Sequence, residues 1–99
     1  MPNKQVTIIA KATAKQGKQD QVKKELLALI DPTRSEAGCI NYSLHQDSDN
    51  DAVFMFYENW TSKEALEQHL QTPHLQGLLG KADELLAEPL EVKFYEILA

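Results

Sequence analysis

The sequence predicts an α+β domain of the ferredoxin-like kind, with strands and helices in the order βαββαβ around one antiparallel sheet. Segments with an apolar residue at every second position alternate with segments whose apolar residues recur every three or four positions. A run of short polar side chains, DSDND at residues 47–51, is typical of a hairpin turn between the two middle strands. The third strand is apolar on both faces, although two helices can cover only one face of such a sheet. We therefore expect a second copy of the chain to cover the other face, because monomers avoid large exposed apolar patches.

The bulk composition is that of an ordinary globular domain. The chain has 99 residues, which predicts a single domain over residues 1–99, and 42% of them are hydrophobic. The formal net charge is -5 and the basic residues are scattered, so we expect no nucleic-acid partner. The start, MPNKQ, has no apolar signal region, and no later run is long enough to span a membrane. We therefore expect a cytoplasmic protein without a membrane partner.

The first half of the chain is expected to form a strand, a helix and a second strand. Residues 5–14 alternate between the two faces of a strand, with one face formed by Val6, Ile8, Ala10 and Ala12. Helical spacing follows at Val22, Leu26, Leu29 and Ile30. Asp31 is a good N-cap and Pro32 fits a first helical position, so a further turn is expected to run to Gly38. The second strand, CINYSLHQ at residues 39–46, is expected to turn Ile40, Tyr42 and Leu44 to one face.

The second half is expected to form a strand, two helices and a closing strand. The third strand is AVFMFYENW at residues 52–60. Thr61 is expected to cap the next helix, because Glu64 stands at the capping-box spacing. Pro73 cannot continue that helix, so Thr72 and Pro73 are expected to open another helix through Leu85. Pro89 stops it, and LEVKFYEIL at residues 90–98 is the expected last strand.

The histidines His69 and His74 raise the question of a metal site. On one continuous helix a spacing of five residues places two side chains about 140° apart, and Pro73 makes a continuous helix unfavourable. No Asp or Glu completes a recognisable ligand set, and the single cysteine, Cys39, is expected to be a small buried group. The sequence therefore predicts no metal site. His69 lies beside the apolar stripe and should point toward the sheet near Trp60, either as a half-buried packing residue or as part of a pocket.

The stretch Tyr57 to His74, YENWTSKEALEQHLQTPH, resembles the antibiotic biosynthesis monooxygenase family, especially its small bacterial quinol-monooxygenase-like members. The matching features are Glu58-x-Trp60, the eight residues between Trp60 and His69, and the HLQTPH run. EAGCINY before the second strand and the order of elements extend the resemblance over nearly the whole chain. The resemblance implies a homodimer with a dimeric α/β-barrel fold, in which each protomer keeps a pocket between its sheet and its helices.

The resemblance also implies an activity. Enzymes of this family oxidise electron-rich phenols or quinols with O₂ and use neither flavin nor metal, so no cofactor is expected. A histidine that titrates near neutrality can remove a phenolic proton, which makes His69 the candidate catalytic residue. Trp60 is the candidate pocket wall, with Asn59 and His74 as further candidate contacts to a small aromatic ligand. Asn59 alternates with Trp60 along the strand, and whether His74 or His45 reaches the pocket stays open.

Three other functions compete with that of a monooxygenase. Haem-degrading relatives use an asparagine on the first strand, but residues 5–14 contain none and Asn3 precedes the strand. Haem degradation is therefore disfavoured. A non-catalytic dimeric module that binds a small molecule or is associated with stress remains an alternative. So does an isomerase or processing enzyme for a small signalling molecule.

Overall fold

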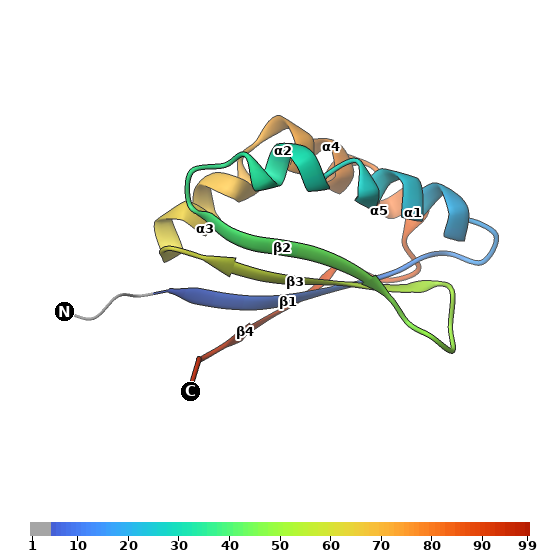
Figure 1. Ribbon diagram of the computed structural model, residues 1–99. Helices are drawn as coiled ribbons and strands as arrows, with labels where there is room; N and C mark the ends of the chain where they lie inside the picture. The colour runs from blue at the N-terminus through green and yellow to red at the C-terminus, as the bar shows by residue number, and fades with distance from the viewer. Residues whose placement is uncertain (1–4) are drawn as a thin grey trace.

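The computed structural model describes residues 5–99 as one four-stranded sheet with five helices (Figure 1). Asn3, the asparagine that precedes the first strand, lies outside these residues. Along the chain the elements are β1 (Val6–Thr13), α1 (Gln19–Leu27), α2 (Ile30–Arg34), β2 (Cys39–Gln46), β3 (Val53–Trp60), α3 (Lys63–Leu70), α4 (Pro73–Gly80), α5 (Ala82–Leu85) and β4 (Glu91–Tyr95).

All strand pairs are antiparallel, and the strand order across the sheet is β2-β3-β1-β4. The helices cover one face of the sheet and leave the other face open (Figure 1). This arrangement confirms the predicted ferredoxin-like α+β fold. The register places Ile8 opposite Glu58 and Glu58 opposite Tyr42, so one row across the middle of the sheet carries two polar side chains toward the helices.

The core lies between the sheet and the helices. Ile8, Ala10 and Ala12 of β1 are buried as their alternation predicted, and Val22 and Leu26 of α1 are completely buried. β3 contributes Phe54, Phe56, Glu58 and Trp60, every second residue of the strand. Glu58 is the exception in this set, because it is a carboxylate on an otherwise apolar strand face.

Several predicted boundaries are wrong in detail. Ser62, not Thr61, caps α3, because its side chain accepts a hydrogen bond from the amide of Ala65. α2 begins at Ile30, so Asp31 stands inside the helix and is not its N-cap. Thr72 does cap α4 and Pro73 does open it, but this helix ends at Gly80 and a separate short helix, α5, follows.

The strands differ from the prediction at two places. A bulge between Cys39 and Asn41 takes Ile40 out of the ladder, and Ile40 is exposed instead of facing the core. β4 ends at Tyr95, so Ile97 lies beyond the strand. Cys39 is only partly buried, and this burial raises the pKa of its thiol.

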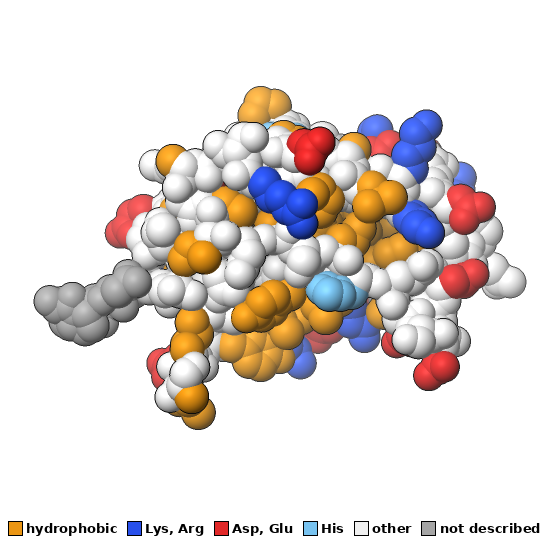
Figure 2. Space-filling view, in the orientation of Figure 1, with side chains coloured by type: hydrophobic (Ala, Val, Ile, Leu, Met, Phe, Trp, Pro, Cys, Tyr) orange, Lys and Arg blue, Asp and Glu red, His pale blue; other side chains and the backbone are white. Residues whose placement is uncertain are grey.

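The open face of the sheet exposes several large apolar side chains. Figure 2 shows hydrophobic groups on the lower side of the molecule, where no helix covers the sheet. Tyr57 and Tyr95 are exposed on this face, beside the half-buried Ile9 and Met55. Val92 and Phe94 are also exposed, but they pair with Ala10 and Ile8 and therefore lie on the helical face of β4. Within residues 5–99, none of the helices has both the length and the apolar character that crossing a membrane requires.

Candidate functional site

A small pocket lies between the sheet and the helices. The volume open to the centre of a water-sized sphere is about 40 Å³. Its polar lining groups are Tyr42, Glu58 and His69, from β2, β3 and α3. Apolar side chains form the rest of the wall: Ile8, Ala10, Leu29, Phe56, Leu66, Leu70, Leu75, Leu78, Leu90 and Val92. A mostly apolar pocket with a few convergent polar groups is the usual form of a small-molecule site.

His69 lies in the last turn of α3 with its imidazole turned toward the sheet. Leu66 and His69 are the two buried residues of this helix, and their spacing of three places both on one helical face. The His69 ring lies 4.6 Å from the Trp60 ring, centroid to centroid, and 5.7 Å from the Tyr42 ring. His69 is therefore enclosed by aromatic rings at one end of the pocket.

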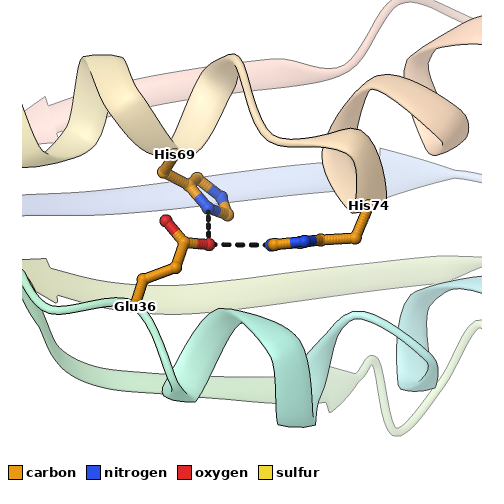
Figure 3. Close-up of side chains that lie close together, drawn as sticks. All are labelled: Glu36, His69 and His74. Carbon is orange, nitrogen blue, oxygen red and sulfur yellow. Dashed lines mark hydrogen bonds and ion pairs between the residues drawn. The ribbon is translucent and has the colours of Figure 1, made fainter.

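Glu36 joins the two histidines. Its Oε2 atom lies 2.8 Å from Nδ1 of His69 and 2.8 Å from Nε2 of His74 (Figure 3). The prediction that no acidic residue completes a set with these histidines is therefore wrong. The helix is interrupted between α3 and α4, so the two imidazole rings do not diverge as they would on one continuous helix. The carboxylate of Glu36 comes from the turn between α2 and β2.

The environment of His69 favours the neutral imidazole. Burial lowers the pKa of His69, and the hydrogen bond to Glu36 opposes this effect only in part. Because a carboxylate accepts hydrogen bonds, we assign the proton of the neutral ring to Nδ1. The lone pair is then on Nε2, as a general base requires.

Trp60 and Glu58 form a second buried pair. The indole Nε1–H of Trp60 donates to Oε1 of Glu58 over 2.9 Å, and both residues are buried. Burial raises the pKa of Glu58 to about 7, although the Trp60 hydrogen bond acts in the opposite direction. Trp60, which the resemblance implied as a pocket wall, contacts His69 and Glu58 and is not among the residues that line this pocket.

Tyr42 provides the third polar group of the pocket. Its ring stacks on Phe56 with the centroids 4.7 Å apart. Burial, with Glu58 nearby, raises the pKa of Tyr42 well above its usual value. The phenol therefore keeps its proton at neutral pH and can serve as a hydrogen-bond donor in the pocket.

Asn59 and His45 lie away from the pocket. The amide of Asn59 accepts a hydrogen bond from Thr7 over 2.6 Å and donates one to Asn41 over 2.7 Å. Strand alternation places all three on the opposite face of the sheet from Trp60. His45 is exposed and lies 3.1 Å from Ser43. The structure thus brings His69 and His74 together through Glu36 and separates Asn59 and His45 from them.

The spacing of residues along the sequence did not identify Glu36, Glu58 and Tyr42 as site candidates. Glu58 carried a usable signal, because it is the only charged residue among the alternate core-facing positions of its strand. The strand pattern placed Tyr42 only on one face of its strand, together with Ile40 and Leu44, and nothing near Glu36 along the chain identifies Glu36 as a site residue. Its partner His69 is 33 positions away.

Comparisons with known proteins identify close relatives. The sequence profile of the family described as "Antibiotic biosynthesis monooxygenase" matches residues 5–79. The Synechocystis protein sll1783 is 44% identical over 79 residues, which cover 76% of this chain but only 54% of that protein, so the chain spans about half of its length. "Putative monooxygenase YcnE" of Bacillus subtilis is 30% identical over 87 residues, covering 88% of this chain and 92% of the relative. The crystal structure of PA3566 from Pseudomonas aeruginosa matches with a TM-score of 0.93 and 35% identity, covering 100% of this chain and 98% of that one.

Proposed function

Because the chain belongs to the antibiotic biosynthesis monooxygenase family, we propose that it oxidises a small electron-rich aromatic compound, a quinol or a phenol, with O₂ and without flavin or metal. The observation that carries this proposal is the placement of His69. Its imidazole lines an apolar pocket, and Nδ1 of the imidazole is hydrogen-bonded to Glu36. A base with a fixed tautomer beside an apolar pocket is what the activation of a phenol requires.

The first step is proton transfer from the substrate hydroxyl to Nε2 of His69. Glu36 stabilises the resulting imidazolium through the Nδ1–H hydrogen bond. The phenolate is a much better electron donor than the phenol, so it can reduce O₂, which reacts poorly with closed-shell molecules. For a quinol the overall balance is quinol plus O₂ to hydroxyquinone plus water, and the substrate itself supplies the electrons.

Glu58 and Tyr42 serve the later steps. With a pKa of about 7, Glu58 can hold or release a proton at neutral pH, so it is suited to protonate the oxygen atom that leaves as water. Tyr42 stays protonated and donates a hydrogen bond to a substrate oxygen. The substrate is a single small ring that enters past the partly exposed side chains of Leu70 and Val92, which lie on the pocket rim.

The working unit is a homodimer of the α/β-barrel type, with one domain over residues 1–99 in each protomer. Support comes from the open sheet face, where apolar residues of β3 and β4 are exposed. Packing two such faces together removes both from water, and each pocket stays on the helical side of its own sheet.

Oxygen uptake with a panel of reduced quinols and phenols, with and without a chelator, tests the proposed activity. Uptake should depend on the protein and survive chelation. His69→Ala should lower turnover by roughly 10²–10⁴-fold, the usual contribution of a general base. The exposed His45 is the matched control, and His45→Ala should leave turnover unchanged. A folded His69→Ala protein with full turnover contradicts the role of His69.

One observation favours a non-catalytic binding module as the second candidate. A volume of about 40 Å³ is small beside common ligand sites, so side chains already fill much of the space. If no compound of the panel supports oxygen uptake, the binding module is the better account. A compound that raises the melting temperature without being consumed would then identify its ligand class.

A further inference from the structure

Glu36, His69 and His74, here called the Glu36 triad, bring three metal-binding atoms together from three separate segments. The donor atoms are one carboxylate oxygen, Nδ1 of His69 and Nε2 of His74, and all lie within 4.8 Å of one another. Figure 3 shows both imidazoles directed at the same oxygen of Glu36. We propose that the Glu36 triad binds one divalent transition-metal ion, such as Zn²⁺, and that this ion inhibits the proposed oxygenase.

The donor set suits a metal of intermediate softness. Two imidazole nitrogens with one carboxylate oxygen are typical ligands of Zn²⁺, Fe²⁺ or Co²⁺, whereas Mg²⁺ and Ca²⁺ prefer oxygen. Three protein ligands leave a position for water, as in open zinc sites. The set therefore predicts selectivity for zinc-like ions over magnesium.

The geometry requires only a small movement. Tetrahedral ligands at zinc distances stand roughly 3.4 Å apart. The two nitrogen–oxygen distances here are 2.8 Å, so the side chains must separate by a fraction of an ångström. The side chain of His69 is 3% exposed and enclosed, but those of Glu36 and His74 are 15% and 21% exposed. These two can adjust, and an ion can reach them from solvent.

The charge of the triad also suits a cation. Among residues 5–99, Glu36 forms ion pairs only with the two histidines and with no Lys or Arg. The nearby Arg34 donates instead to the backbone oxygen of Tyr42. A partly buried carboxylate between two imidazoles therefore lacks a permanently charged partner, which a divalent ion would supply.

Metal binding and base catalysis exclude each other at His69. In the metal-free triad Nδ1 carries the proton and Nε2 carries the lone pair. An ion on Nδ1 displaces that proton, so the neutral ring must then carry its proton on Nε2. A ring in this state cannot accept the substrate proton, and the bound ion therefore inhibits turnover. Only this inhibitory part of the inference rests on the proposed function.

Calorimetric titration of the protein with Zn²⁺, after dialysis against a chelator, tests the site without any substrate. We expect one Zn²⁺ per chain. Glu36→Gln and His74→Ala should each weaken binding by about tenfold or more. His45→Ala is the control and should bind as the wild type does. Titration with Co²⁺ should give the visible absorption bands of a nitrogen- and oxygen-ligated ion, and these bands should be lost in the two triad variants.

The outcomes separate the two proposals. Absence of saturable binding overturns the metal site, and so does binding that Glu36→Gln and His74→Ala leave unchanged when circular dichroism shows both variants folded. If His74→Ala does not fold, His74→Gln takes its place. If Zn²⁺ binds but the metal-free protein shows no oxygen uptake, the metal site stands and the proposed function fails. If Zn²⁺ binds and uptake continues at saturation, the inhibitory role is overturned.

Discussion

At the residue scale, burial favours the uncharged form of two different side chains in one pocket. His69 is a base whose pKa is lowered, and Glu58 is an acid whose pKa is raised to about 7. Each has one strong hydrogen-bond partner, Glu36 for His69 and Trp60 for Glu58. A pocket that holds a neutral base and a half-protonated acid at neutral pH can both remove and return protons.

The raised pKa of Glu58 predicts how the stability of the protein depends on pH. Between about pH 4.5 and pH 7 the folded protein keeps the Glu58 proton while the unfolded chain releases it, so the free energy of unfolding falls as pH rises through this range. The change from 4.5 to about 7 corresponds to ~3 kcal/mol. Glu58→Gln should remove this loss and be more stable than the wild type at pH 8.

Urea unfolding of both proteins at pH 4 and pH 8 measures the effect. The control is Glu67→Gln, at an exposed position of α3, which should keep the wild-type pH dependence. If Glu58→Gln and the wild type lose the same stability between the two pH values, Glu58 does not hold its proton in the folded state.

At the element scale, the turn between α2 and β2 determines where Glu36 lies. Gly38 in this turn packs directly against α3, and its carbonyl accepts a hydrogen bond from the amide of Thr61 over 2.9 Å. A Cβ atom at Gly38 would collide with the Cβ of Ala65. Close approach of the turn to α3 therefore depends on a residue without a side chain.

Gly38→Ala should destabilise the protein by about 1–3 kcal/mol, the usual cost of overpacking. Gly77 is the matched control, because a Cβ there meets no described atom within 4 Å and the residue lies inside α4. Gly77→Ala should be neutral or stabilise by up to about 1 kcal/mol, since alanine is the better helix former. Chemical denaturation of the two variants gives both values, and equal effects would contradict the packing argument.

The Gly38→Ala variant also bears on the site. If the turn moves away from α3, Glu36 moves away from His69, and the hydrogen bond that holds Nδ1 weakens. Turnover per folded molecule should then fall in Gly38→Ala and stay unchanged in Gly77→Ala. Oxygen uptake under conditions in which both variants are folded measures this difference.

At the scale of the whole molecule, the sheet has one covered and one open face. The open face carries Tyr57 and Tyr95, which are 40% and 49% exposed. The same face carries the buried contact of Asn59 with Thr7 and its partly buried contact with Asn41. The face thus combines exposed tyrosines with a fixed polar cluster and with the charged side chains of Lys11 and Lys93, and this pattern is suited to pair with a second copy in a single register.

Light scattering should therefore give twice the chain mass of 11.2 kDa. Tyr57→Glu places a charge in the proposed interface and should give the monomer mass, because a buried unpaired charge is costly. Leu27→Glu changes an exposed apolar residue on α1, on the helical side, and should remain dimeric. A wild-type protein that is a monomer at micromolar concentration removes the basis for the barrel.

The sequence by itself determined the order of elements, most of the core-facing residues and the family. These properties depend on neighbouring residues: strand alternation, helical spacing, and the helix break that Thr72 and Pro73 impose. The exact caps and the bulge at Ile40 did not follow, because nearby residues compete closely for those positions. The alternation of side chains along a strand also showed that Asn59 and Trp60 could not both belong to the site, because neighbouring residues of one strand face opposite sides of the sheet.

Only the tertiary structure decided which side chains share the site. Glu36 meets His69 across 33 positions of sequence, and it does so because the α2–β2 turn packs against α3 and because the chain bends between α3 and α4. The raised pKa of Glu58 likewise depends on helices that cover its strand, not on its neighbours in sequence. Contacts and burial of this kind arise from packing between distant segments, whereas periodicity reports only which face a residue occupies.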